Sequence, residues 1–269
     1  MSRLHLHILG SGSKGNCALI EGPQGLTMVD DGLSRRETLK RMAELGLSAD
    51  DVYALVVTHE HSDHIKGLEV WCKHWNGPVF SSRGTLTSKE SLAHLPVEEF
   101  DPGDALSIAG VHIQTYSTSH DVVNPVGYRF DAQGDSIGFA TDTGELSKHA
   151  IDTLKDCRIL ALESNHDVTM LRQGDYPRFL QERILSVKGH LSNDQAADAA
   201  RALATDRTEQ LIAMHISQDN NRPSLTVKSY ASSLDATLDN ELGSTATRVE
   251  GLHKLTIRPA GQYRPMTIQ

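Results

Sequence analysis

The chain has 269 residues, which is enough for one large domain with a substantial buried core. Its net charge of -9 excludes a surface that clamps nucleic acid everywhere regardless of sequence, because such binding neutralises phosphates with Lys and Arg. No segment approaches the ~20 apolar residues of a membrane-spanning helix, so we expect a soluble protein with no membrane partner. The first residues alternate in polarity and lack the apolar run of a secretory signal, which favours the cytoplasm.

Cysteine and histidine usage bears on metal chemistry. Cys17, Cys72 and Cys157 are widely spaced and fit neither a disulfide framework nor a CxxC metal site, so they predict reduced core thiols. The 14 histidines are unusually many, and histidine is the commonest metal ligand. Their positions along the chain therefore decide whether a metal site is present.

The first part of the chain predicts three strands and a helix. Apolar residues of segment 4–8 alternate with His5 and His7, which is the period of a half-buried strand and places both histidines on its solvent face. The helix begins at a capping-box pattern formed by Ser34 and Glu37. The other elements of this opening are strands at residues 17–21 and 26–29 and the helix itself at residues 34–46.

Residues 53–58 form a continuous apolar, β-prone run, as expected for a strand buried on both faces. The run stops at the first residue of His59-Glu-His-Ser-Asp-His64, so this histidine cluster lies at the carboxyl end of a strand. Helix and strand alternate afterwards. Helices are predicted at residues 65–75, 87–94, 146–154, 178–185 and 192–204, strands at residues 79, 111–117, 127–130, 136–140, 158–163 and 210–215, and, after residue 232, one helix and a final strand at residues 254–258.

The histidine cluster has the composition of a catalytic metal site. Alternate residues of an extended segment point the same way, so His59, His61 and Asp63 converge while His64 turns in from the next position. Two imidazoles and a carboxylate suit Zn²⁺, and also Mn²⁺ or Fe²⁺, and the absence of thiolates argues against a closed structural zinc site. A solvated polar loop explains any one of these residues alone, but it does not explain the whole pattern.

The pattern His-x-His-x-Asp-His after a buried strand resembles the metallo-β-lactamase superfamily, and the resemblance extends over nearly the whole chain. It implies an α/β fold, a four-layer αββα sandwich, formed as a single domain over residues 1–269. It also implies that Asp30, in Val-Asp-Asp-Gly, supports the metal loop through hydrogen bonds to the ligands.

The same resemblance implies a binding site for two divalent metal ions, Zn or Mn with Fe as a further possibility. His120 in Ser-Thr-Ser-His-Asp, Asp142 in Ala-Thr-Asp-Thr-Gly and His215 in Ala-Met-His-Ile-Ser match ligand positions of the family. Taken singly, His120 and His215 fit a structural histidine equally well, but their order and strand-end placement favour the ligand role. The implied ligands are His59, His61 and His120 for the first ion, Asp63, His64 and His215 for the second, and Asp142 for both.

Two divalent ions bound by the carboxylates Asp63 and Asp142 leave a formal charge of about +2, so the site attracts anions. Such a pair lowers the pKa of a bridging water and stabilises the attacking and leaving oxygens of an in-line displacement. A phosphodiester, attacked by a hydroxide that bridges the metals, is the natural substrate. A thioester, lactone or lactam would be activated too, so the metals alone leave the substrate class open.

Gly189-His-Leu-Ser-Asn193 resembles the Gly-His-Ser-Thr motif of the tRNA-processing nucleases in the superfamily. By that similarity His190 lies near Asp63 and is the general acid that protonates the leaving oxygen. The implied catalytic residues are Asp63, Asp142 and His190. Ser192 is also expected to cap the helix that follows it.

Several separated segments resemble the WalJ (YycJ)-like subgroup, whose members are 5′ exonucleases on DNA. The subgroup implies a nucleic acid substrate, DNA rather than RNA. Asp31 stands where the subgroup usually has a small residue, and Val122 where it has alanine, but neither change touches a ligand. Ser13 and Asn16 fit a tight turn as well as a phosphate contact. The expected substrate-binding residues are Ser13, Asn16, Asn165, His166, Ser192 and Asn193.

The main alternative is a thioester or lactone hydrolase of the glyoxalase II type, and His190 as an acid for the leaving group disfavours it. A redox diiron protein of this superfamily typically has Glu where this chain has His61. A non-catalytic module is disfavoured because every ligand position is filled. The cationic residues between two of the motifs fit a DNA backbone and solvated helix faces equally well; they are Arg172, Arg178, Arg183 and Lys188. Metal identity, DNA versus RNA, strand preference, oligomeric state and biological pathway stay open.

Overall fold

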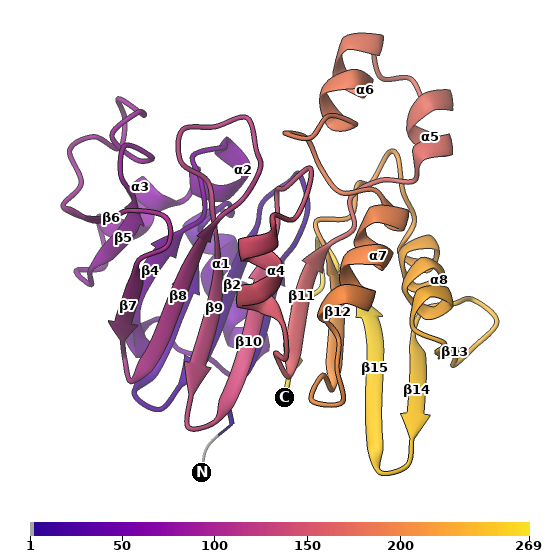
Figure 1. Ribbon diagram of the computed structural model, residues 1–269. Helices are drawn as coiled ribbons and strands as arrows, with labels where there is room; N and C mark the ends of the chain where they lie inside the picture. The colour runs from indigo at the N-terminus through magenta and orange to yellow at the C-terminus, as the bar shows by residue number, and fades with distance from the viewer. Residues whose placement is uncertain (1–2) are drawn as a thin grey trace. The chain divides into compact units, whose positions relative to one another are not determined.

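The computed structural model describes residues 3–269, which form two compact units. The first unit contains the chain up to Ser117 together with Val122–Asp135 and Gly261–Gln269. The second contains Thr118–Asp121 and Ser136–Ala260. Figure 1 shows the helices and strands of both. The single domain over residues 1–269 stays a prediction.

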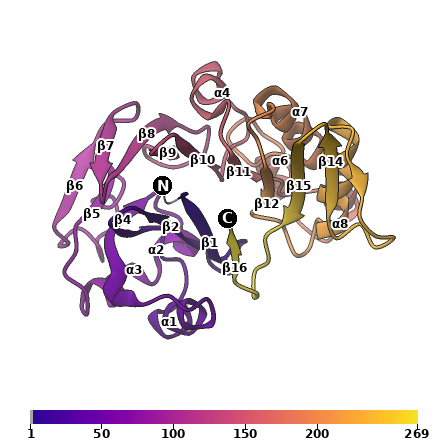
Figure 2. The same cartoon turned by 90° about the horizontal axis from the view of Figure 1, so that it is seen from below.

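The first unit contains a seven-stranded sheet in the order β16-β1-β2-β3-β4-β5-β6. Neighbouring strands from β3 to β6 run parallel, so their carboxyl ends lie along one edge. Figure 2 shows β16 beside β1, which joins the last strand of the chain to the first. The strands are β1 (His5–Gly10), β2 (Cys17–Gly22), β3 (Gly25–Val29), β4 (Val52–Val57), β5 (Val79–Ser82), β6 (Val97–Phe100) and β16 (Met266–Ile268).

Helices cover a buried core in this unit. Helix α1 (Arg35–Glu44) begins as predicted, because the Ser34 side chain accepts a hydrogen bond from the Glu37 backbone N–H. Met42 of this helix and Trp71 each expose 1% of their surface and join one hydrophobic cluster with residues of β3 and β4. The remaining helical elements are η1 (Ala49–Asp51), α2 (Ser62–Ile65) and α3 (Leu68–Cys72).

The predicted helix at residues 65–75 is two short helices, α2 and α3, interrupted at Gly67. The Gly67 backbone N–H donates to the Asp31 carbonyl at 2.8 Å, and a Cβ on Gly67 would meet the Leu33 carbonyl oxygen at 2.0 Å. A contact with a loop distant in sequence therefore overrides the local helical pattern.

The predicted helix at residues 87–94 is wrong, because the chain forms successive turns there. Hydrogen bonds such as Leu92 N–H to Lys89 O and Ser88 N–H to Gly84 O close single turns without a continuing ladder. The Ser88 hydroxyl donates to the Thr85 carbonyl, which shows how short polar side chains compete with a helix.

Strands β7 (Ala105–Ile108), β8 (Val111–Ser117) and β9 (Val126–Ala132) follow as an antiparallel meander.

The second unit contains strands in the order β10-β11-β12-β15-β14-β13. Strands β10, β11, β12 and β15 are parallel, and β11 is buried along its whole length, as its apolar run predicts. The strands are β10 (Asp135–Ala140), β11 (Ile159–Glu163), β12 (Gln210–Met214), β13 (Thr237–Leu238), β14 (Ala246–Glu250) and β15 (His253–Pro259). The strand predicted at residues 254–258 is confirmed as β15, although β16 follows it.

The helices of the second unit lie in two places. Figure 1 shows α7 and α8 packed together over the strands of this unit, and α5 and α6 beyond the carboxyl ends of those strands. The sequence did not predict α5 and predicted a helix only after residue 232, whereas α8 begins at Pro223, a residue that suits the first helical turn. The helices are α4 (Lys148–Leu154), α5 (Val168–Gln173), α6 (Arg178–Ile184), α7 (Asn193–Leu203) and α8 (Pro223–Ser233).

Histidine and cysteine burial differs in part from expectation. The solvent-face position predicted for His7 is wrong, because His7 is 3% exposed and both its ring nitrogens are hydrogen-bonded, to the Thr267 and Glu21 side chains. Burial lowers the pKa of His7, against the attraction of Glu21. Cys17 and Cys157 are buried, Cys72 is half-buried, and all three are free thiols, as predicted.

Within residues 3–269, every helix is too short or too polar for a bilayer span.

Three loops of the first unit are joined by backbone hydrogen bonds. Asn16 N–H donates to the Asp63 carbonyl at 2.7 Å, and Gly32 N–H donates to the Asn16 carbonyl at 2.8 Å. Asp31 N–H donates to the His64 carbonyl at 2.8 Å. The loops after β1, β3 and β4 therefore hold one another in place.

We predict that Gly32→Ala disrupts this junction, because a Cβ there would meet the Asp63 carbonyl oxygen at 1.6 Å. The expected loss is about 3 kcal/mol or more of unfolding free energy, measured by urea denaturation. Gly261→Ala is the matched control, since its Cβ would lie 3.7 Å or more from its neighbours. Equal stability of the two variants would show that the loops adjust freely.

Candidate metal centre

Three residues at strand ends have a left-handed backbone that is rare outside glycine. Asp30 follows β3 in the first unit with φ of 60°. Asp142 and His215 follow β10 and β12 in the second unit with φ of 56° and 51°. Each such residue costs on the order of 1–3 kcal/mol and persists where surrounding contacts fix it, often at ligand-binding sites. All three are residues for which the sequence predicts a role at the metals.

Asp30 connects β3 to the histidine segment. Parallel pairing of β3 with β4 places Val29 opposite Val56, so Asp30 lies beside Thr58. The Asp30 carboxylate, 2% exposed, accepts hydrogen bonds from the Thr58 backbone N–H and hydroxyl, both at 2.8 Å. His64 Nδ1 lies 2.8 Å from the same carboxylate. As a donor at Nδ1, His64 presents Nε2 as its ligand atom, which fits the predicted support of the metal loop.

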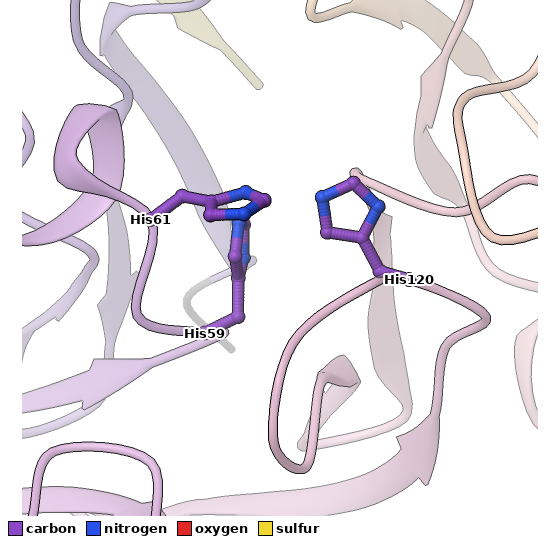
Figure 3. A group of neighbouring side chains, drawn as sticks. All are labelled: His59, His61 and His120. Carbon is purple, nitrogen blue, oxygen red and sulfur yellow. The ribbon is translucent and has the colours of Figure 1, made fainter. Parts of the chain in front are cut away.

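The first unit gathers the predicted ligands His59, His61, Asp63 and His64. The ring centroids of His59 and His61 are 4.9 Å apart, and those of His59 and His64 are 4.1 Å apart. Figure 3 shows His59 and His61 projecting side by side from the segment that follows β4. His59 and His64 are buried at 1% and 0% exposure, whereas the Asp63 side chain is 22% exposed.

Asn16, predicted to contact substrate, is buried against these ligands. Its amide oxygen accepts from Gly12 N–H at 2.8 Å, and its Nδ2 lies 2.9 Å from His64 Nε2 and 3.2 Å from Asp63 Oδ2. These contacts position two candidate ligands. Ser13, on the same loop, is exposed. Substrate contact by Asn16 and Ser13 stays a prediction.

Glu163 is the residue that organises the second unit, and the sequence analysis did not single it out. It ends β11 and is 0% exposed. Its Oε1 lies 2.8 Å from His190 Nδ1 and 2.9 Å from His215 Nδ1, while Oε2 accepts from the backbone N–H groups of Thr143 and Leu191. The signal was present, because an ionisable residue at the end of a wholly apolar strand needs partners.

The charge state of Glu163 determines which ring nitrogen of His190 and of His215 carries the hydrogen. Burial by itself would raise the pKa of Glu163, but attraction to His190 and hydrogen bonds from His190 and His215 hold that pKa well below its usual range. An ionised carboxylate accepts hydrogen bonds only, so both histidines donate from Nδ1. Glu163 thereby sets the orientation of both imidazoles and directs their Nε2 atoms away from itself.

Asp142 and His120 complete the predicted ligands of this unit. His120 lies on the loop after β8, as Figure 3 shows, and its Nδ1 donates to the Gly189 carbonyl at 3.0 Å. The Asp142 carboxylate, 2% exposed, lies 3.8 Å from His120 Nε2 and 3.3 Å from His215 Nδ1. Asp142, Glu163, His190 and His215 each offer a donor atom within 4.8 Å of the others.

The other predicted substrate contacts are buried in internal hydrogen bonds. Asn165 Nδ2 donates to the His215 carbonyl at 2.9 Å, and Asn193 accepts from the Ser164 hydroxyl at 2.7 Å. Ser192 caps α7 in a full capping box, as predicted. Burial lowers the pKa of His166 to about 4, so this 0% exposed imidazole is neutral. These buried residues stabilise the loops of the second unit through internal hydrogen bonds. Their contact with substrate stays a prediction.

The donors in each unit fit borderline divalent metal ions. Each unit supplies buried imidazoles together with at least one carboxylate, and none of these groups contains a thiolate. That composition suits Zn²⁺, Mn²⁺ or Fe²⁺ and is unlike a closed structural zinc site. The carboxylates also offset the charge of the ions.

Comparisons with known proteins agree on one family. The family profile described as Beta-lactamase superfamily domain matches residues 27–216. Exodeoxyribonuclease YycJ of Bacillus anthracis is 36% identical over 236 residues, covering 86% of this chain and 89% of that protein. Exodeoxyribonuclease WalJ of Streptococcus pneumoniae serotype 2 (strain D39 / NCTC 7466) is 34% identical over 220 residues, covering 80% and 82%.

Among solved structures, the metallo-beta-lactamase fold protein YhfI from Bacillus subtilis matches with a TM-score of 0.69 and 13% identity. The match covers 99% of this chain and 100% of that one. It confirms the predicted α/β class and fold.

Asp31 lies in the loop beside Asp30 and is 0% exposed. Its Oδ1 accepts a hydrogen bond from the Thr38 hydroxyl at 3.0 Å. Burial raises the pKa of Asp31 to about 7, and the Asp30 carboxylate adds to that rise while Thr38 opposes it. The folded protein therefore holds this proton more tightly than the unfolded chain does.

We predict that this carboxyl makes the metal-free protein less stable as pH rises. Its contribution is fully present below about pH 4 and is lost as pH rises through about 7, the folded-state pKa. Asp31→Asn should flatten this dependence and stabilise the protein at pH 8 by about 2–4 kcal/mol, measured by urea denaturation in EDTA. Asp50→Asn, at an exposed carboxyl, is the control and should keep the wild-type profile. An unchanged profile in Asp31→Asn would contradict the assignment.

Proposed function

The chain belongs to the metallo-β-lactamase superfamily and is a metal-dependent hydrolase, and from this premise we propose that it is a phosphodiesterase that degrades DNA from the 5′ end. The proposal rests on the pair of partly exposed His190 and buried Glu163 beside Asp142, which supplies a proton donor for a leaving oxygen. It is supported by two relatives named exodeoxyribonuclease that align over at least 80% of this chain.

We propose the ligand assignment that the family resemblance implies. His59, His61 and His120 hold one ion, Asp63, His64 and His215 hold a second, and Asp142 is shared. When bound, a pair of divalent ions supplies an activated water molecule and neutralises charge that develops on the phosphate. The donor sets favour Zn or Mn, with Fe as a further possibility.

The chain's own residues provide the proton chemistry. His190 Nδ1 is held by Glu163, the His190 side chain is 18% exposed, and its Nε2 accepts no hydrogen bond within residues 3–269. That atom is the one from which a proton passes to the leaving oxygen. The position of Asp63 near His190 stays a prediction. Within its own unit, His190 is hydrogen-bonded to the Glu163 carboxylate. The hydrogen bond to Glu163 fixes the orientation of the His190 ring before the transfer.

We assign substrate binding to the segment that contains helices α5 and α6. Helix α6 has no buried residue, and Phe179 on it is 73% exposed. Arg178 and Lys188 are exposed nearby in sequence, whereas Arg183 is paired with Asp121, its Nη2 lying 3.0 Å from Oδ1. Exposed cations with an aromatic ring suit a single-stranded backbone with stacked bases. Of the cations predicted to follow DNA, Arg183 is thus already engaged within the protein.

The proposal predicts metal-dependent release of nucleotides from 5′-labelled DNA. His190→Ala should lower the rate about 10²–10⁴-fold, because the leaving oxygen loses its proton donor. Asp142→Ala should remove activity together with bound metal. His149→Ala, at an exposed histidine of α4, is the control and should leave both unchanged.

The same preparations are assayed on RNA and on S-lactoylglutathione. Faster cleavage of RNA than of DNA would change the substrate but keep the reaction class. Thioester turnover with intact nucleic acid would contradict the proposal and favour the glyoxalase II type.

Glu163→Gln tests the positioning of His190. An amide can present its N–H to the imidazole, so the ring loses its fixed orientation, and kcat should fall about 10–100-fold with little change in KM. Restored activity in Glu163→Asp would support a positioning role, and metal content measured in parallel separates this effect from loss of an ion. Glu182→Gln, on the exposed surface of α6, is the control. A wild-type kcat in Glu163→Gln would contradict the role.

A further inference from the structure

A second group of metal-ligating side chains lies in the first unit, on β1 and β2. His5 and His7 are two positions apart on β1, so they point to the same face of the sheet. Glu21 on β2 is the cross-strand partner of His5. His7 lies three residues before Gly10, where β1 ends, which is ~10 Å along the strand. The group is thus separate from the loop junction at Asn16.

The three side chains already converge on one point. Glu21 Oε2 lies 2.8 Å from His5 Nδ1 and 3.1 Å from His7 Nε2. One donor atom from each residue lies within 4.8 Å of the other two. Ligands on a tetrahedral Zn²⁺, with bonds of ~2.0–2.1 Å, are separated by roughly 3.3–3.5 Å. The two distances to Glu21 Oε2 are shorter than this separation, so Glu21 moves outward when an ion enters.

The outer contact of His7 suits metal binding. Its Nδ1 lies 2.9 Å from the Thr267 hydroxyl on β16. When His7 donates from Nε2 to Glu21, the hydroxyl donates to Nδ1. When Nε2 binds a metal, Nδ1 carries the hydrogen and the hydroxyl accepts it. Thr267 therefore satisfies either tautomer, as a residue behind a metal-bound histidine must.

We propose that His5, His7 and Glu21 form a peripheral site for one Zn²⁺ ion or a similar borderline divalent ion. Two imidazoles and one carboxylate are a donor set that Zn²⁺ favours, and the absence of a thiolate or a third imidazole leaves a position for water. The His5 side chain is 29% exposed and that of Glu21 is 44% exposed, so an ion can enter from solvent.

The consequence of this peripheral site is structural. The ion ties β1 to β2 directly, and His7 and Thr267 extend the connection to β16. Because an ion that binds only the folded state stabilises it, zinc should raise the unfolding temperature through these three strands.

The test counts zinc on the full chain after EDTA treatment and reloading, by elemental analysis and calorimetric titration. Wild type should bind one ion more per chain than Glu21→Gln or His5→Gln. The controls, Glu98→Gln on β6 and His112→Gln on β8, remove an exposed carboxylate and an exposed imidazole from other strands and should match wild type. The difference between variants does not depend on how many ions the candidate metal centre holds.

A crystal of the zinc-loaded protein, measured at the zinc absorption edge, should show an anomalous peak among His5, His7 and Glu21. If His5→Gln does not fold, Glu21→Gln decides alone, since its side chain is nearly half exposed. Equal zinc content in wild type and Glu21→Gln, together with no peak at this position, would overturn the proposal. A zinc-induced rise in unfolding temperature as large in Glu21→Gln as in wild type would overturn the structural role.

Discussion

The arrangement of the candidate metal centre depends on buried carboxylates at the ends of parallel strands. Asp30 in the first unit and Glu163 in the second are 2% and 0% exposed, and each accepts hydrogen bonds from imidazole Nδ1 atoms and backbone N–H groups. A buried carboxylate without such partners is costly, so it fixes the position of whatever satisfies it. His64, His190 and His215 are held in this way.

This constraint explains why the two units share a design despite different connectivity. In each, parallel pairing brings strand ends to one edge, and the residue after β3, β10 or β12 leaves the sheet with a left-handed backbone. Orientation is then set from behind by a carboxylate or a carbonyl, as with His120 and the Gly189 carbonyl. Metal ligands need fixed tautomers, and these contacts provide them before any ion binds.

The proposed reaction and the proposed peripheral site place the same residue types in different settings. At the centre, Glu163 is fully buried and its carboxylate fixes the orientation of the His190 ring for the proposed proton transfer. At the periphery, Glu21 is partly exposed between His5 and His7, and its carboxylate can shift to admit an ion. The buried carboxylate of Glu163 is therefore fixed in position, whereas the partly exposed carboxylate of Glu21 can move. Helix α6 carries the exposed ring of Phe179, to which the proposed function assigns contact with a nucleic acid strand.

The sequence by itself determined the strands with continuous apolar runs, the capped start of α1 and the placement of His59 and Asp142 at strand ends, because these follow from periodicity within a few residues. Only the tertiary structure decided the role of Glu163, the burial of His7 and Asn16, and the break at Gly67. Each of these depends on a partner distant along the chain: His190, the strand β16, the Asp63 loop and the Leu33 carbonyl, respectively. The local sequence pattern cannot predict such partners, because residues far apart in the chain come into contact only when the strands have paired and the loops have packed.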